Sequence, residues 1–286
     1  MKLVNDFYEY KILDMANGQK LESWNGVILS RPDPQIIWND KQSDEWSKAQ
    51  ATYHRSKTGG GNWEIKKNIP NWQIHYQDLT FNLKLMGFKH TGLFPEQAYN
   101  WNLIREKIKN AGRKVKVLNL FAYTGGASIA ALSAGAEVVH VDSSRGMIDW
   151  AKENVKSNNL NDKPIRFLVD DVVKFVEREI RRGNKYDIIL MDPPSFGRGA
   201  NKEVWNIETD LYDLVDKCTK ILSDDPIFFL INSYTTGLSM TILENILNLT
   251  VNKIHKGNIS SDELGIKEVG RELILPCGIY ARWEKI

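Results

Sequence analysis

The spacing of hydrophobic and polar residues divides the chain near residue 87. Before that point, short apolar-rich runs alternate with turn residues, and Asn17-Gly18 and Asn25-Gly26 separate the first three runs. Asn-Gly favours a tight hairpin because both residues tolerate a positive φ. We therefore predict an antiparallel meander and further strands in a β-rich region. The predicted strands cover residues 10–15, 21–24, 27–30, 72–77 and 79–86.

From residue 87 onward, helical and strand-like segments alternate. An entry helix is predicted over residues 95–110, with Pro95 in its first turn, where a missing N–H costs nothing. Alternation of this kind predicts a doubly wound α/β sheet. The predicted strands cover residues 115–120, 137–142, 165–169, 186–191 and 227–231, with two further strands near 264–269 and 279–283. The helices that follow them are predicted to end near residues 134, 157, 182, 222 and 249.

The first strand of this series, Val115 to Leu120, ends in a Thr-Gly-Gly turn. Gly125 and Gly126 allow the backbone to approach a bound molecule closely, and the carboxyl end of a central strand is where open α/β sheets bind ligands. The turn lacks the full Gly-x-Gly-x-x-Gly fingerprint, which argues against a nicotinamide dinucleotide.

Acidic residues end the next strands. Asp142 lies sixteen residues beyond Gly126, where a carboxylate can accept both hydroxyls of a ribose. Asp170 or Asp171 can accept the amino group of an adenine, and either can instead cap the helix that follows. Together these positions indicate a nucleoside site.

The segment Asp192-Pro-Pro-Ser-Phe196 follows the strand at 186–191. Asp192 and the carbonyl of Pro193 can accept hydrogen bonds from a planar amino group, and Phe196 can stack on its ring. This arrangement would orient a base nitrogen for attack. The basic loop at 197–202 is either a lid over a nucleic acid or an ordinary surface loop.

Composition and charge narrow the class of protein. The 286 residues are 42% hydrophobic and carry a net charge of +2, which neither requires nor excludes RNA. The two cysteines, Cys218 and Cys277, suit a reducing compartment, and no cluster has metal-ligand spacing. With an acidic amino terminus and no apolar run approaching ~18 residues, we expect a cytoplasmic protein without a bound metal.

Tryptophan is concentrated in the first 101 residues. Beside Arg31, His54, Arg55 and Lys57, these rings form either a stacking platform for RNA bases or the core of a small β domain. The tryptophans concerned are Trp24, Trp38, Trp46, Trp63, Trp72 and Trp101.

These motifs in combination resemble those of class I S-adenosylmethionine-dependent methyltransferases. The resemblance rests on segments 119–127, 141–144, 170–172 and 192–196, and it is strongest over residues 87–235. More narrowly, the motifs and the Thr91-Gly-Leu-Phe-Pro-Glu-Gln97 segment look like those of bacterial large-subunit ribosomal RNA methyltransferases that modify cytosine or guanine. The resemblance implies a Rossmann-like fold with a seven-stranded, mostly parallel sheet. It also implies a substrate-recognition domain at 1–86 and a cofactor-binding domain at 87–286.

The resemblance also implies roles for individual residues. The cofactor S-adenosylmethionine would contact Phe94, Gln97, Asn119, Phe121, Tyr123, Thr124, Gly125, Gly126, Asp142, Ser143, Asp171 and Asp192. The residues facing the methyl acceptor, and thus catalytic, would be Asp192, Pro193 and Phe196. Apart from the resemblance, the candidate substrate contacts are Arg31, His54 and Arg55 of the β-rich region, which are either substrate contacts or ordinary surface charges, together with Ser195 and Arg198.

One departure from the family bears on the chemistry. Members that methylate carbon 5 of cytosine use a cysteine just after the fifth strand, and this chain has Asn232-Ser233-Tyr234 there. We therefore expect methylation of a base nitrogen in RNA, with ribosomal RNA favoured. The alternatives are a methyltransferase acting on a small molecule or protein, and a noncatalytic RNA-binding factor that retains the fold.

Overall fold

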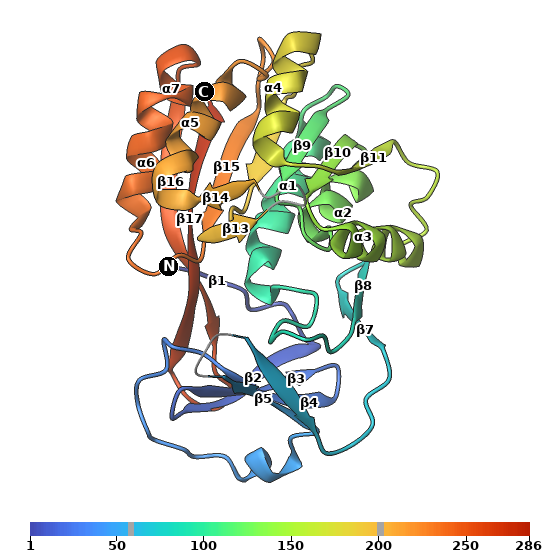
Figure 1. The fold of residues 1–286 in the computed structure, drawn as a ribbon, viewed down its shortest axis with the longest axis vertical. Helices are drawn as coiled ribbons and strands as arrows, with labels where there is room; N and C mark the ends of the chain where they lie inside the picture. The colour runs from blue at the N-terminus through green and yellow to red at the C-terminus, as the bar shows by residue number, and fades with distance from the viewer. Residues whose placement is uncertain (57–59, 199–202) are drawn as a thin grey trace. The chain divides into compact units, whose positions relative to one another are not determined.

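The computed structural model describes residues 1–56, 60–198 and 203–286 (Figure 1). The chain forms two compact units. The small unit contains Lys2–Tyr99 and Gly265–Cys277, and the large unit contains Met1, Asn100–Leu264 and Gly278–Ile286.

The small unit contains a sheet with the strand order β2-β3-β4-β5-β6. Its strands are β2 (Tyr10–Ala16), β3 (Gln19–Trp24), β4 (Val27–Pro32), β5 (Ala51–Arg55) and β6 (Gly61–Ile65). The predicted meander of β2, β3 and β4 is confirmed, because both pairs are antiparallel and all four Asn-Gly turn residues have positive φ. A separate hairpin joins β7 (Trp72–Tyr76) and β8 (Leu79–Leu83).

The sequence did not predict β5 and β6. Their residues are mostly polar and short of apolar alternation, and only Ala51 and Tyr53 are buried. What makes them strands is pairing: β5 lies parallel to β4 and antiparallel to β6. A 3₁₀ helix at Asp44–Lys48 precedes them.

The large sheet has the order β1-β16-β17-β15-β12-β9-β10-β11. The strands β15, β12, β9, β10 and β11 run parallel to one another, and β17 is antiparallel to β15, so the predicted mostly parallel arrangement is confirmed. The described sheet has eight strands, one more than the predicted seven. Its strands are β1 (Lys2–Leu3), β9 (Lys116–Leu120), β10 (Glu137–Asp142), β11 (Ile165–Val169), β12 (Ile188–Met191), β15 (Phe228–Ser233), β16 (Gly257–Lys267) and β17 (Ile274–Lys285).

Helices flank this sheet in two groups (Figure 1). One group contains α1 (Ala98–Asn110, after a 3₁₀ turn at Pro95–Gln97), α2 (Gly126–Ser133) and α3 (Arg145–Ser157). The other group contains α4 (Val172–Arg182), α5 (Ile207–Thr219), α6 (Met240–Leu249) and α7 (Val251–Ile254). Apolar side chains of α4, α5 and α6 form a continuous core with Leu118, Val139 and Ile189 of the sheet.

Two predicted segments differ from the structure. The last two strands are longer than predicted, because polar residues outside the apolar runs also take part in pairing. The loop expected at 197–202 is partly a hairpin of β13 (Phe196–Arg198) and β14 (Val204–Asn206), and residues 199–202 lie outside the described residues. Among the described residues, no helix is long and apolar enough to cross a membrane.

Candidate functional site

The carboxyl ends of four neighbouring parallel strands form the candidate site. In the sheet order β12-β9-β10-β11, Leu120 is in register with Met191 on one side and with Val141 on the other, and Asp142 is in register with Val169. The loops that begin at residues 121, 143, 170 and 192 therefore emerge from the same edge of the sheet. This edge is where parallel α/β sheets bind ligands.

The loop after β9 has an unusual backbone that the structure holds in place. Phe121 and Tyr123 have φ values of 54° and 50°, a region that costs residues other than glycine about 1–3 kcal/mol each. Neighbouring residues fix this shape: the amide of Ala122 donates to the carbonyl of Val141 at 3.0 Å, and Asn154 Nδ2 donates to the carbonyl of Thr124 at 2.9 Å. Strain of this kind is retained where a loop must match a ligand, which supports a site here.

The two glycines of the turn have a packing role that the sequence did not reveal. A Cβ on Gly126 would lie 2.9 Å from Cζ2 of Trp101, and one on Gly125 would lie 3.2 Å from Cβ of Ala151. Gly125 also has a φ of 90°. The turn therefore needs glycine to fit against α1 and α3, whether or not a ligand is present.

A buried polar network lies beneath the loop. Asn119 Nδ2 donates to Ser128 Oγ at 2.9 Å, and Ser128 Oγ lies 2.9 Å from His140 Nδ1. Burial lowers the pKa of His140 to about 3, so the imidazole is neutral at physiological pH. The sequence predicted Asn119 but missed Ser128 and His140. The sequence feature that could have indicated this network is the histidine in the otherwise apolar strand Val138 to Val141.

Asp142 lies at the end of β10 with both carboxylate oxygens engaged. Its Oδ2 accepts from the amide of Tyr123 at 2.9 Å, and its Oδ1 accepts from the amide of Ser144 at 2.8 Å. Burial raises the pKa of Asp142, and these two hydrogen bonds act against the rise. Each oxygen retains a second acceptor direction, which suits two ribose hydroxyls. Ser143 is exposed beside it.

The two acids after β11 have different roles. Asp171 caps α4, because its Oδ1 accepts from the amide of Lys174 at 2.9 Å. Asp170 forms an ion pair with Arg178 instead. The cap is therefore Asp171, the residue to which the resemblance also assigns the adenine. Its contact with the adenine stays a prediction.

The loop after β12 is anchored through its backbone. The carbonyl of Pro194 accepts from Trp205 Nε1 at 2.7 Å, and the carbonyl of Ser195 accepts from the amide of Ile207 at 3.1 Å. Asp192 is half-buried and Pro193 is buried. Trp205 also packs against Phe121, with ring centroids 5.0 Å apart, which links the loops after β9 and β12.

The side chains that follow are presented to solvent. Phe196 is 57% exposed, and the Arg198 guanidinium lies 6.0 Å from the centroid of its ring. Ser195 Oγ lies 2.7 Å from Thr235 Oγ1, at the end of β15. An exposed aromatic ring on an anchored loop is suited to stacking on a planar acceptor.

The cysteines do not supply a nucleophile. β15 extends to Ser233, two residues beyond the predicted strand, so Asn232 lies inside the strand; it is buried and accepts from Asn100 Nδ2 at 3.0 Å. Cys218 is buried in α5, and burial raises its pKa. Burial also raises the pKa of Cys277, which disfavours its reactive thiolate.

The predicted residues of the small unit have varied environments. Arg31 is buried and donates to both carboxylate oxygens of Glu22, at 2.6 and 2.8 Å, so its charge serves an internal ion pair. His54 pairs with Glu64 at 2.8 Å, and Arg55 is exposed. Lys57 lies outside the described residues.

Phe94 and Gln97 also belong to the small unit. The Phe94 ring lies 5.1 Å from that of His90, and Gln97 is buried in the 3₁₀ turn. Their contact with the cofactor stays a prediction.

Most tryptophans of the first 101 residues are structural. Trp24 and Trp101 are buried, and the indole N–H of Trp46 donates to Asp14 at 2.8 Å. Trp38 and Trp72 donate to backbone carbonyls at 2.7 and 3.1 Å. The core explanation therefore holds fully for Trp24 and Trp101. The rings of Trp38, Trp46 and Trp72 are half-buried and held by these hydrogen bonds, and Trp63 is half-buried as well.

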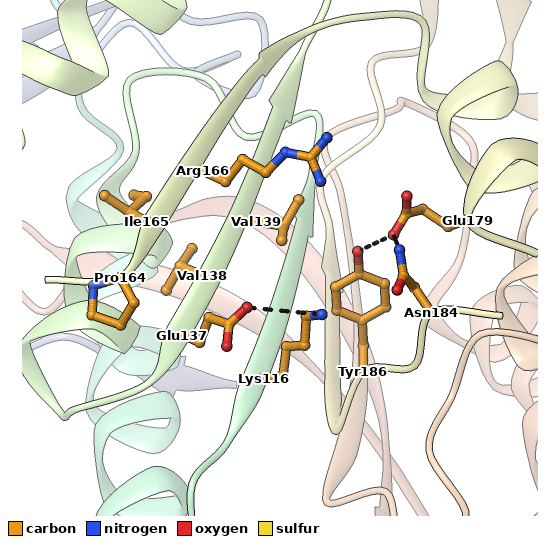
Figure 2. A pocket seen from close by; sticks show the side chains of 10 residues that line it. All are labelled: Lys116, Glu137, Val138, Val139, Pro164, Ile165, Arg166, Glu179, Asn184 and Tyr186. Atoms are coloured by element: carbon orange, nitrogen blue, oxygen red, sulfur yellow. Dashed lines mark hydrogen bonds and ion pairs between the residues drawn. The ribbon is translucent and has the colours of Figure 1, made fainter. Parts of the chain in front are cut away.

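A pocket of about 230 Å³ lies at the amino-terminal ends of the parallel strands (Figure 2). It is lined in part by Lys116, Glu137, Glu179 and Tyr186. These groups satisfy one another: Lys116 pairs with Glu137 at 3.8 Å, and the Tyr186 hydroxyl donates to Glu179 at 2.6 Å (Figure 2). The pocket is at the wrong edge of the sheet for the ligand site, so the carboxyl-end loops are the better candidate.

The parallel sheet, the strained loop after β9 and the carboxylate of Asp142 define an α/β protein that binds a nucleoside-containing cofactor. The chain belongs to the S-adenosylmethionine-dependent methyltransferase family, whose profile matches residues 37–238.

Known proteins agree with this assignment. The crystal structure of the S-adenosylmethionine-dependent methyltransferase from Agrobacterium tumefaciens is 34% identical, with a TM-score of 0.93 over 99% of this chain and 93% of that chain. The structure of SMU.776, complexed with S-adenosylhomocysteine, shares the fold with a TM-score of 0.73 at 20% identity, over 98% of this chain and 76% of that chain.

Curated relatives are larger proteins. The ribosomal RNA large subunit methyltransferase K/L of Shewanella sp. strain MR-4 is 33% identical over 62% of this chain and 26% of its own length. That of Pseudoalteromonas atlantica is 37% identical over 50% of this chain and 19% of its own length. The matched region thus spans about a fifth to a quarter of these relatives.

The residues present fit S-adenosylmethionine. Asp142 would hold the ribose hydroxyls, Asp171 the adenine amino group, and the loop at 121–125 the methionine portion. When bound, the cofactor supplies a sulfonium methyl group that is already activated. The protein's task is therefore to orient the acceptor and to exclude water.

Proposed function

We propose that this protein transfers a methyl group to a base nitrogen of RNA, with ribosomal RNA the favoured substrate. The observation that carries the proposal is the loop after β12: its backbone is anchored by Trp205 and Ile207, while the Phe196 ring is 57% exposed. An exposed ring on an anchored loop suits stacking on a flipped or unpaired base. The names of the curated relatives support RNA as the substrate.

The proposed nitrogen target rests on the residues at the carboxyl end of β15. Carbon 5 of cytosine requires a covalent nucleophile, and Asn232 occupies the place of the cysteine that would provide it. An amino nitrogen needs only alignment: Asp192 and the Pro193 carbonyl would accept its hydrogens and direct its lone pair toward the methyl carbon. The reaction would take place in the cytoplasm.

Asp192→Asn tests the acceptor role, with Asp213→Asn on the exposed face of α5 as the matched control. We expect Asp192→Asn to lose about 100-fold in methyl transfer at saturating S-adenosylmethionine, because the amino group is no longer aligned, and calorimetry measures any change in cofactor affinity separately. Transfer at the wild-type rate would remove Asp192 from the mechanism.

Mass spectrometry identifies the substrate. Ribosomal RNA from cells with and without this protein is digested to nucleosides, and fragmentation places the missing methyl group on a ring carbon or on a nitrogen. We expect one N-methylated nucleoside to disappear. A missing 5-methylcytidine would refute the nitrogen target, and an unchanged nucleoside profile would refute ribosomal RNA as the substrate.

A further inference from the structure

One face of the small-unit sheet carries a row of basic side chains. Lys20 and Arg31 are directly opposite each other in the β3–β4 register, so they point to the same face. Leu29 is paired with Ala51 in the neighbouring parallel strands β4 and β5. Because alternate residues of a strand share a face, Arg55 of β5 lies on the same face as Arg31. The row therefore crosses three strands, with Arg31 buried, Lys20 half-buried and Arg55 exposed at its end.

The segment at 87–90 lies against this face. Arg31 Nη1 donates to the carbonyl of Lys89 at 3.1 Å, and Trp63 Nε1 of β6 donates to the carbonyl of Phe88 at 3.2 Å. The Phe88 ring lies 6.1 Å from that of His90. These contacts fix Phe88 and Lys89 beside the row of basic side chains.

Some basic side chains in this region have a carboxylate partner and others do not. Arg31 is neutralised by Glu22, and Lys20 pairs with Asp33 at 3.3 Å. Within the described parts of the chain, neither Arg55 nor Lys89 forms an ion pair.

The surroundings of Lys89 also favour an anion. Burial is the main factor that lowers the pKa of Lys89 to about 8, and the nearby charges of Lys20, Arg31 and Arg55 lower it further, whereas Asp33 acts in the opposite direction. A bound anion would relieve this repulsion.

Aromatic surface lies beside the two unpaired cations. Phe88 is 36% exposed, and Trp63 is half-buried, with its ring 5.3 Å from that of Tyr53. Proteins bind single-stranded nucleic acids by combining cations that contact the phosphates with neighbouring aromatic rings that stack on the bases. An acidic peptide would use the cations but would have no base to place on Phe88.

We propose that Arg55, Lys89 and Phe88 form an RNA-binding patch on the small unit, in which the two cations contact phosphates and Phe88 stacks on a base. This proposal rests on the proposed RNA substrate and adds a second contact surface to it. The patch would hold RNA flanking the methylated nucleotide, which increases affinity without taking part in the chemistry.

The double variant Arg55→Gln/Lys89→Gln tests the phosphate contacts. Its matched control is Lys11→Gln/Lys67→Gln, which removes two exposed lysines of the same unit. Binding of a fluorescent single-stranded RNA of about 12 nucleotides is followed by anisotropy over a range of salt concentrations. The slope of log K against log salt should become shallower by about 1.4 in the patch variant, because two phosphate contacts are lost. Equal slopes for the patch and control variants would overturn the proposal.

Phe88→Ala tests stacking separately. We expect it to weaken RNA binding by about 5- to 100-fold while leaving the salt slope unchanged, because a base–aromatic contact releases no counterions. Polyglutamate serves as a competitor. If it displaces RNA from the wild-type protein at equal charge concentration and Phe88→Ala has no effect, the patch is a general anion site and not an RNA site.

Cofactor and transfer measurements separate this proposal from the proposed function. Each variant is first checked for an unchanged circular dichroism spectrum and for wild-type affinity for S-adenosylmethionine by calorimetry. If the wild type binds RNA through the patch but ribosomal RNA from deletion cells shows no lost methyl group, the proposed substrate fails and the patch stands. If methyl transfer is confirmed and the variants bind RNA like the wild type, the patch fails alone.

Discussion

Replacing Gly126 by alanine should destabilise the protein because α2 begins directly against Trp101. The new Cβ would lie 2.9 Å from Cζ2 of the Trp101 ring, well inside the about 3.5–4.0 Å of an ordinary carbon contact. Trp101 is only 2% exposed, so its ring has no solvent to move into. Overpacking of this kind costs about 1–3 kcal/mol, partly offset by up to about 1 kcal/mol of helix propensity. We expect a net loss of about 1–2 kcal/mol.

Gly146→Ala is the matched control for this substitution. Gly146 also lies in the first turn of a helix, α3, but a Cβ there would meet nothing closer than Ser144 Oγ at 3.9 Å. With no clash, alanine should stabilise the fold by about 0.5–1 kcal/mol. Relative to the wild type, Gly126→Ala should therefore lose stability and Gly146→Ala should gain it. Their free energies of unfolding should differ from each other by about 2 kcal/mol.

Urea denaturation measures the free energy of unfolding of both variants, with the m-value checked for constancy. The double variant Gly126→Ala/Trp101→Leu should lose less than the sum of its single variants by about 1 kcal/mol, because shortening the side chain removes the clash. The reasoning is refuted if Gly126→Ala is as stable as Gly146→Ala, or if the double variant is strictly additive.

Three further predictions concern charge. Asp142→Asn should weaken S-adenosylmethionine binding in calorimetry by about 10- to 100-fold, and an unchanged Kd would contradict a ribose contact. His140, whose pKa burial lowers to about 3, should show no imidazole titration by NMR between pH 8 and 5; its stabilising effect is complete above about 6.5 and declines as pH falls toward 3. Burial opposes ionisation of Glu22, but Arg31 and Lys20 outweigh it and lower its pKa to about 2. The ion pair of Glu22 with Arg31 should therefore stabilise the fold fully above about pH 4.5 and lose this effect toward pH 2. Glu22→Gln should flatten the pH dependence of the free energy of unfolding in that range.

The local sequence pattern was sufficient to predict those helices and strands whose limits depend on their own residues. The strand at 165–169 and the helices ending at residues 182 and 249 match β11, α4 and α6, because apolar spacing, caps and glycine ends are encoded within each segment. The Asn-Gly hairpins were also predicted, since the turn chemistry is local. The acids at strand ends were found for the same reason.

The strands β5, β6, β13 and β14 were not predicted, because they are short and lack an alternating apolar pattern. They become strands by pairing, β5 with β4 and β6, and β13 with β14. The partners of charged residues were equally hidden. Arg31 looked like a substrate contact, yet the pairing of β3 with β4 brings it next to Glu22, a diagonal neighbour in the sheet that lies nine residues away in sequence.

The sequence by itself determined the α/β sheet, the glycine turn after the first strand and the acids that follow the next strands, because each depends on residues a few positions apart. Tertiary structure decided which acid caps α4, why Gly126 must be glycine, and which cations are left without a carboxylate partner. These outcomes depend on contacts between segments that are far apart in the chain, such as Trp101 with Gly126 and Arg31 with the carbonyl of Lys89. Distances of that kind are set by packing, which no local pattern encodes.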